Sequence, residues 1–259
     1  MKQPLAYIHP AAKLAPSVVV DPFVTIDANV EIGEGTRILS GATIFEGTRI
    51  GRNCTVFPGA VIGAIPQDLK FRGEETYAII GDNTTIRECV TINRGTAARG
   101  KTVVGSNCLI MAYTHVAHDC LIGDHVILAN ATQLAGEVTV DDYAILGGGT
   151  LVHQFCHLGP HIMVQGGALI NKDIPPFVKA AREPIAYTGL NSVGLRRRGF
   201  SSETIRDIQE VYRYIYMSGM NVSDAVERIE VELPASPERD EILQFIRNSK
   251  RGIIRGYFS

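Results

Sequence analysis

Three of the seven histidines, His115, His118 and His153, have the residue type and the spacing for joint proton-transfer chemistry. An imidazole with an ordinary pKa of about 6.5 can take a proton from a hydroxyl group at neutral pH. Asp119 is a candidate to orient the second ring nitrogen of His118, although adjacent residues of a strand point in opposite directions. Gly136 follows His118 after 18 residues, and its unobstructed N–H is the kind of donor that an oxyanion needs. These residues indicate a general base beside a backbone donor.

An aliphatic residue recurs every six residues along most of the chain, and this repeat gives the spacing of 18 its meaning. Counted in steps of six from Ile8 to Ile170, 25 of 28 positions hold Ile, Leu or Val. A small or β-branched residue often follows four positions later. A period of six fits neither a helix nor a continuous strand, but it fits a short strand followed by a corner. The repeat therefore predicts a β-solenoid with one large and one small inward side chain per hexapeptide.

If three hexapeptides complete one coil, residues 18 apart stack on neighbouring coils. His118, Gly136 and Gln154 then form a column, with His153 beside it and His115 at the edge of the same wall. None of these histidines occupies an inward position of the repeat. We therefore expect them to face solvent or a second subunit.

Two polar segments, residues 64–76 and 93–102, interrupt the repeat. They are predicted to be loops that leave the coil wall, and loops on a rigid scaffold often carry function. The repeat ends near Pro175.

A helical period follows the repeat, with apolar residues that predict a helix over 202–217. A second helix is predicted to begin near Asn221 or Ser223 and to stop before Pro234, and a third to begin at Ser236. We therefore expect two domains, a β-solenoid over residues 1–190 and a helical domain over 191–259 that caps it or contacts another subunit.

Composition excludes several classes of protein. With 27 acidic and 25 basic residues, the net charge of −2 gives no general attraction for nucleic acid or anionic membranes. The chain has no apolar run of the length of a membrane span and no apolar N-terminal stretch typical of a signal peptide. The odd count of five cysteines favours a reducing compartment, so we expect a cytoplasmic protein.

Four of the cysteines occupy the small inward position and are expected to be buried, inert thiols: Cys54, Cys108, Cys120 and Cys156. Cys89 lies off that register.

No C-x-x-C motif supports a zinc knuckle, and we predict neither a metal nor a cofactor. Zinc bound by histidines of neighbouring chains, as in solenoid lyases, remains an open alternative at this stage. A purely structural solenoid with a flat binding face is a third class, but it calls for sustained outward threonine columns, which are lacking.

Several motifs resemble the UDP-N-acetylglucosamine acyltransferase family. They comprise residues 67–70 (QDLK), 116–123 (VAHDCLIG), 134–136 (LAG), 152–156 (VHQFC), 175–177 (PPF) and 194–200 (GLRRRGF). The resemblance extends over essentially the whole chain, and the ordered set is more specific than the hexapeptide repeat alone. It implies a left-handed parallel β-helix of triangular section with a C-terminal helical domain, in a homotrimer with active sites between subunits.

The resemblance also implies the reaction, which is the first acylation of lipid A synthesis. A (3R)-3-hydroxyacyl group moves from acyl carrier protein to the 3-hydroxyl of UDP-N-acetylglucosamine. His118 matches the general base, Gly136 the oxyanion donor and Gly166 the position that limits acyl length. The residues that match or neighbour the substrate contacts of the family are Gln67, Asp68, Lys70, His115, His153, Gln154, Asn191, Arg197 and Arg198.

The chain departs from the family pattern at two positions. Glu137 follows Gly136 where the family often has His, and Val193 replaces a Glu near the nucleobase. These departures leave open an amino-sugar acceptor, which would give an amide in place of an ester. The later N-acyltransferase of the same pathway has an extra N-terminal domain, for which a repeat that begins at Ile8 leaves no room.

Overall fold

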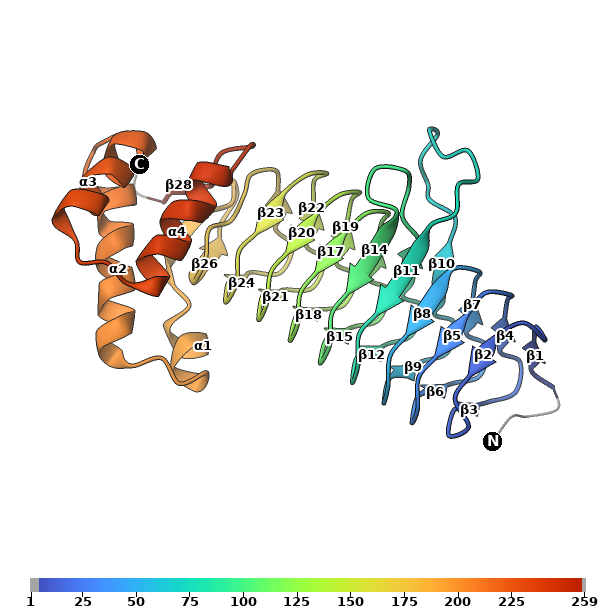
Figure 1. Cartoon of the computed structure of the whole chain (residues 1–259). Coiled ribbons are helices and arrows are strands. Elements are labelled where there is room, and N and C mark those ends of the chain that lie inside the picture. The colour runs from blue at the N-terminus through green and yellow to red at the C-terminus, as the bar shows by residue number, and fades with distance from the viewer. Residues whose placement is uncertain (1–4, 258–259) are drawn as a thin grey trace.

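The computed structural model describes residues 5–257, and most of them build a solenoid of short parallel strands (Figure 1). The first four residues of the N-terminal stretch, which was predicted not to be a signal peptide, lie outside the described part. Successive strands fall in turn into three sheets, so that three strands and three corners complete one coil. The strand partner of His115 is Gln133, 18 residues further on, and this register confirms the predicted stacking.

The sheets contain the following strands. The first consists of β1 (Tyr7–Ile8), β4 (Thr25–Ile26), β7 (Thr43–Ile44), β10 (Val61–Ala64), β13 (Thr91–Asn93), β16 (His115–Val116), β19 (Gln133–Leu134), β22 (Leu151–Val152) and β25 (Leu169–Ile170). The second consists of β2 (Lys13–Leu14), β5 (Glu31–Ile32), β8 (Thr48–Ile50), β11 (Tyr77–Ile80), β14 (Lys101–Val104), β17 (Leu121–Ile122), β20 (Thr139–Val140) and β23 (His157–Leu158). The third consists of β3 (Val19–Val20), β6 (Arg37–Ile38), β9 (Thr55–Val56), β12 (Thr85–Ile86), β15 (Leu109–Ile110), β18 (Ile127–Leu128), β21 (Ile145–Leu146), β24 (Met163–Val164), β26 (Val178–Ala181), β27 (Ala186–Leu190) and β28 (Arg255–Gly256).

The core is a column of the aliphatic residues that set the repeat. Ile44, Ile62 and Ile92, on successive coils of the first sheet, are completely buried. Each such side chain removed from water contributes about 1.5–3 kcal/mol, so the repeat supplies the main driving force for coiling. The small inward positions confirm the expectation for the cysteines, since four are buried and free while Cys89 is exposed.

The corners stack into three edges. We name them the loop edge, the stack edge and the third edge. The loop edge joins the first and second sheets at residues 117–120, 135–138 and 153–156. The stack edge joins the second and third sheets at residues 123–126, 141–144 and 159–162. The third edge leads back to the first sheet at residues 129–132, 147–150 and 165–168.

Both predicted loops are present, and both interrupt the loop edge. One leaves the first sheet after β10 and enters the second sheet at β11, and the next one connects β13 with β14 in the same way. Figure 1 shows the two loops projecting on the same side of the solenoid. Two segments that are far from His118 in sequence therefore reach its edge.

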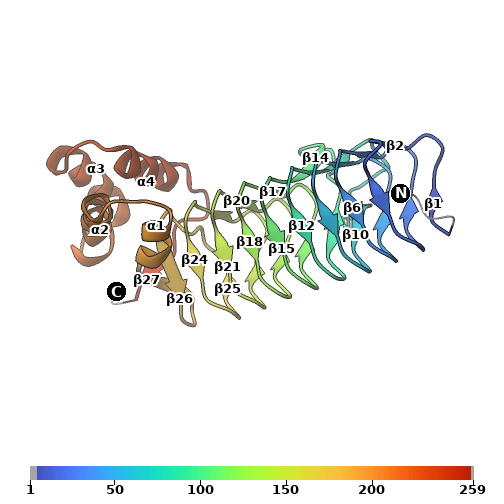
Figure 2. The same cartoon turned by 90° about the horizontal axis from the view of Figure 1, so that it is seen from below.

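The C-terminal part begins with the antiparallel pair β26–β27 and continues through helices α1 (Ser192–Arg197), α2 (Ser202–Met217), α3 (Val222–Glu232) and α4 (Pro237–Asn248). The predicted second helix begins after Asn221, whose side chain accepts from Asp224 N–H, and the third begins after Ser236 with Pro237 in its first turn. Viewed from below, the helices close one end of the solenoid (Figure 2). The domain division at residue 190 stays a prediction, and β28 returns to pair with β27 across it.

Candidate active site

His118 and Asp119 form a direct hydrogen-bonded pair at the loop edge. The distance between His118 Nδ1 and Asp119 Oδ2 is 2.8 Å. The objection that adjacent strand residues point apart does not apply, because Asp119 lies in the corner with a left-handed φ of 60°. Since an ionised carboxylate can only accept, Nδ1 carries the proton and Nε2 is left as the acceptor. The geometry thus provides a base with a defined tautomer.

His118 is buried within its own chain, whereas we expected it to face solvent or a second subunit. Its exposed fraction is 8% and that of Asp119 is 0%. The repeat pattern classified it as outward, but the loop of residues 93–102 packs around Asp119 and covers the corner. Burial makes the imidazole a group of one fixed orientation.

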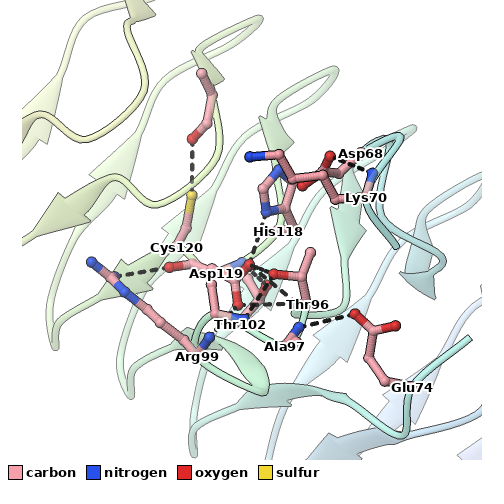
Figure 3. Close-up of polar contacts among 12 residues, drawn as sticks. Asp68, Lys70, Glu74, Thr96, Ala97, Arg99, Thr102, His118, Asp119 and Cys120 are labelled. Atoms are coloured by element: carbon pink, nitrogen blue, oxygen red, sulfur yellow. Dashed lines mark hydrogen bonds and ion pairs between the residues drawn. The ribbon is translucent and has the colours of Figure 1, made fainter. Parts of the chain in front are cut away.

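The carboxylate of Asp119 is fully satisfied by the second loop and by His118 (Figure 3). Thr96 donates its N–H at 3.0 and 3.1 Å to the two oxygens and its hydroxyl at 2.6 Å, and Arg99 donates its N–H at 3.1 Å. A further bond from the Arg99 guanidinium reaches the carbonyl oxygen of Asp119 at 2.9 Å. A buried carboxylate is tolerated when it accepts several such bonds. Sequence reasoning marked this segment as a loop but did not identify Thr96 or Arg99 as partners of Asp119.

Gly136 lies directly beneath the His118 ring on the next coil. A Cβ placed on Gly136 would be 2.6 Å from both Cε1 and Nε2 of His118. Any larger residue would therefore displace the base. Within residues 5–257, the N–H of Gly136 donates to no protein acceptor. A free donor beside Nε2 is the arrangement required for base catalysis with oxyanion stabilisation.

His115 and the 64–76 loop lie around the same pair. His115 Nδ1 is 2.7 Å from Thr91 Oγ1, and burial, followed by the nearby His118, lowers the pKa of His115. Asp68 and Lys70 share a tight turn in which Lys70 N–H donates to Asp68 Oδ1 at 2.9 Å. Both are drawn with His118 in Figure 3. Gln67 precedes them and is exposed.

His153 and Gln154 occupy the corner two coils beyond His118 on the loop edge. His153 is exposed, and its Nδ1 is 3.1 Å from the carbonyl oxygen of Gln154. Gln154 is partly exposed. The column predicted from the spacing of 18 is therefore present.

Asn191 and Arg198 lie on the stack edge and not with His118. Asn191 Nδ2 donates to the carbonyl oxygen of His161 at 2.9 Å, while its Oδ1 accepts from Gly194 N–H at the start of α1. Arg198 Nη2 donates to the carbonyl oxygen of Tyr143 at 3.0 Å, with its guanidinium 5.2 Å from the centre of that ring. The predicted residues thus form two groups on different edges of one chain.

The remaining candidates also lie away from His118. Arg197 is exposed at the end of α1. Gly166 is exposed on the third edge, where an added Cβ would approach Gly148 O at 3.0 Å. No group of three His, Cys, Asp or Glu among residues 5–257 is arranged to hold a metal ion. In the same part of the chain, no helix is long and apolar enough to cross a membrane.

A stack of rings follows the stack edge, at positions that are 18 residues apart in the sequence. Tyr143 lies between His125 and His161, with ring centres 4.5 and 4.9 Å away. Burial, followed by the charge of Arg198, lowers the pKa of His161 to about 4. The stack holds Arg198 against the solenoid and keeps His161 neutral.

The coil of hexapeptides and its histidine site define a class, the hexapeptide-repeat transferases. A family model of the bacterial transferase hexapeptide, with six repeats, matches residues 101–136, and one of the GMPPB C-terminal domain matches residues 2–107. The model described as UDP-N-acetylglucosamine O-acyltransferase, domain 2, matches residues 173–254.

Relatives that align with three quarters or more of the chain narrow the class of protein to one family. The acyl-[acyl-carrier-protein]–UDP-N-acetylglucosamine O-acyltransferase of Thermodesulfovibrio yellowstonii is 45% identical over 96% of this chain and 97% of its own length. The enzyme of that name from Chlorobium phaeobacteroides is 55% identical over 75% of this chain and 74% of its own length. The chain therefore belongs to the acyl-[acyl-carrier-protein]–UDP-N-acetylglucosamine O-acyltransferase family and is an acyltransferase.

Solved structures agree with this assignment. A UDP-N-acetylglucosamine acyltransferase from Bacteroides fragilis has a TM-score of 0.97 and 59% identity over 98% of this chain and 100% of that chain. The Francisella novicida enzyme of that name has a TM-score of 0.96 and 41% identity over 99% and 95%. The predicted left-handed parallel β-helix with a C-terminal helical region is confirmed.

Proposed function

We propose that this chain transfers a (3R)-3-hydroxyacyl group from acyl carrier protein to the 3-hydroxyl of UDP-N-acetylglucosamine, the first step of lipid A synthesis. The observation that carries the proposal is the buried His118–Asp119 pair with the free N–H of Gly136 beside it. The names of its relatives supply the substrates. No cofactor enters the proposed chemistry.

The mechanism follows from the tautomer of His118. Nε2 accepts the proton of the sugar hydroxyl while the hydroxyl oxygen attacks the carbonyl carbon of the thioester. The π electrons of the C=O bond move onto the carbonyl oxygen. The N–H of Gly136 stabilises that oxyanion. Collapse of the intermediate breaks the C–S bond, and the proton held by His118 passes to the leaving thiolate. Asp119 stabilises the imidazolium that exists between these two steps.

Substrate binding divides between the two groups of residues. Gln67, Asp68, Lys70, His115, His153 and Gln154 are the proposed contacts to the acceptor from the edge that carries the base. Asn191, Arg197 and Arg198 are the proposed nucleotide contacts, and a neighbouring subunit must supply them because they lie on another edge of one chain. We therefore propose a homotrimer with sites between subunits, acting in the cytoplasm. Gly166, on the third edge, would limit the length of the acyl chain.

The test is acyl transfer with purified protein. (3R)-3-Hydroxyacyl carrier proteins of several lengths are incubated with UDP-N-acetylglucosamine, and the product is followed by mass spectrometry. His118→Ala should lower the rate about 10²- to 10⁴-fold. His9→Ala, on the first coil, is the matched control and should stay within about twofold, because among residues 5–257 the His9 side chain makes only a local bond to Ala11 N–H and the base stays in place.

Each outcome has one meaning. The ester-forming reaction is supported if the native chain forms a product that His118→Ala does not form, and if mild base hydrolyses the acyl group from that product. Transfer only to the 3-amino analogue, with a base-stable product, would replace the proposed acceptor by the amino sugar. Absence of transfer at every acyl length to either acceptor would overturn the proposal.

A further inference from the structure

The two loops at the loop edge differ in how firmly the structure holds them. The 93–102 loop is fixed by the fully buried carboxylate of Asp119, through Thr96 and Arg99. The 64–76 loop carries Asp68 and Lys70, and its turn is closed by local bonds such as Phe71 N–H to Asp68 O at 3.1 Å. Local bonds shape this turn but do not place it relative to His118.

Contacts between the loops are needed to place the turn. At the roots, backbone bonds join Arg94 N–H to Ala64 O and Gly95 N–H to Tyr77 O, at 3.0 and 3.1 Å. Further out, Glu74 Oε1 accepts from Ala97 N–H at 3.0 Å (Figure 3). Ala97 directly follows Thr96, so its N–H belongs to the segment that Asp119 fixes. Glu74 therefore connects the first loop to the most firmly held part of the second.

Glu74 uses its other oxygen within its own loop. Oε2 accepts from Arg72 N–H at 2.8 Å, and the Arg72 guanidinium donates to Leu69 O at 2.7 Å. Leu69 lies between Asp68 and Lys70. Hydrogen bonds, chiefly from Arg72 N–H, lower the pKa of Glu74, so the side chain is a carboxylate at neutral pH. One carboxylate thus bridges the rigid loop and the turn that carries the two polar residues.

We infer that Glu74 is a positioning residue. By joining the 64–76 loop to the loop that Asp119 anchors, it holds Asp68 and Lys70 where they can bind the acceptor sugar nucleotide. The inference rests on the proposed function, in which Asp68 and Lys70 contact that substrate. Glu74 does not touch the base or the oxyanion donor, so its contribution is to acceptor binding and not to the chemical step.

Glu74→Gln keeps the size of the side chain but leaves one acceptor oxygen for two N–H donors. Loss of one such bond should raise the KM for UDP-N-acetylglucosamine about three- to tenfold. The kcat and the KM for the acyl carrier protein thioester should stay within about twofold, because His118 and Gly136 are unchanged. Amide hydrogen exchange at Ala97 should become faster.

Glu75→Gln is the matched control. Glu75 accepts from the Tyr77 hydroxyl at 2.6 Å, and within residues 5–257 its side chain makes no hydrogen bond or ion pair with the second loop. It should leave the KM for the acceptor unchanged. An unchanged acceptor KM in Glu74→Gln, an equal rise in Glu75→Gln, or a loss confined to kcat would each overturn the inference. The native enzyme is measured in the same series, so a failure of the proposed function would show separately, as no acylation of UDP-N-acetylglucosamine by the native chain.

Discussion

The His118 ring rests on the backbone of Gly136, with no room for a Cβ between them. One contact between neighbouring coils therefore brings the proposed base and the proposed oxyanion donor together. The strand ladder that carries this contact is continuous, from Val116 paired with Leu134 onward to Val152. The relative position of the two groups consequently depends on the rigidity of the solenoid.

Gly136→Ala should lower kcat by about 10²-fold, because a displacement of roughly 1 Å at the base removes the attack geometry. The KM for either substrate should change little. Steady-state kinetics with each substrate varied in turn would measure this, beside the melting temperature. A kcat within twofold of the native value would contradict the close contact.

Asp119→Asn should reduce kcat about 10²- to 10⁴-fold and also destabilise the protein by about 1–3 kcal/mol. The amide group of Asn has one acceptor oxygen for donors on Thr96, Arg99 and His118, so buried N–H groups lose partners. Chemical denaturation and kcat measured on the same preparation test both effects. If stability fell while kcat was retained, Asp119 would be only an anchor for the loop.

Mixing two inactive variants tests whether sites form between subunits. His118→Ala and Arg198→Ala change residues on different edges of the chain, and each alone should be impaired. Trimers reassembled from both should regain activity, because some interfaces then combine a native His118 with a native Arg198 from the neighbour. Reassembled trimers of each variant alone are the control. No recovery in verified mixed trimers would place the complete site within one chain.

The pH dependence of stability should contain a contribution from His161. Its pKa of about 4 in the folded chain lies below the ordinary value of 6.5. The unfolded state therefore binds the proton first, so this contribution is complete above about pH 6.5 and is lost as the pH falls toward 4. His161→Phe, which extends the ring stack with a group that cannot titrate, should flatten the free energy of unfolding across this window. Denaturant titrations at several pH values measure this effect. If the expectation is wrong, the free energy of unfolding will change with pH equally in the native chain and in His161→Phe.

The repeat made most of the fold predictable, whereas the burial of His118 and Asp119 could not be predicted from it. Residues 18 apart identified the column of His118, Gly136 and Gln154 because the register is uniform from coil to coil. Alternation along a strand failed for Asp119, since the corner places it in a left-handed conformation. The cover over His118 depends on where a loop folds back, and hydrogen bonds from Thr96 and Arg99 have no periodic signature.

The same limit applies to the arginines of the 194–200 motif. The resemblance placed Arg197 and Arg198 among the substrate contacts, but it did not show that Arg198 is held by a carbonyl oxygen and the ring of Tyr143, which is distant in sequence. Only the three-dimensional stacking of corners brings those groups together.

The C-terminal strand β28 returns to the third sheet and pairs with β27 beyond the last coil. A parallel solenoid otherwise ends in a row of unpaired backbone groups, against which another molecule can add its own strands. β28 pairs with β27, and Ile174 forms a bridge to Leu158, so part of this end is covered. We therefore expect the C-terminal segment, besides any role in the reaction, to hinder the addition of another solenoid at this end.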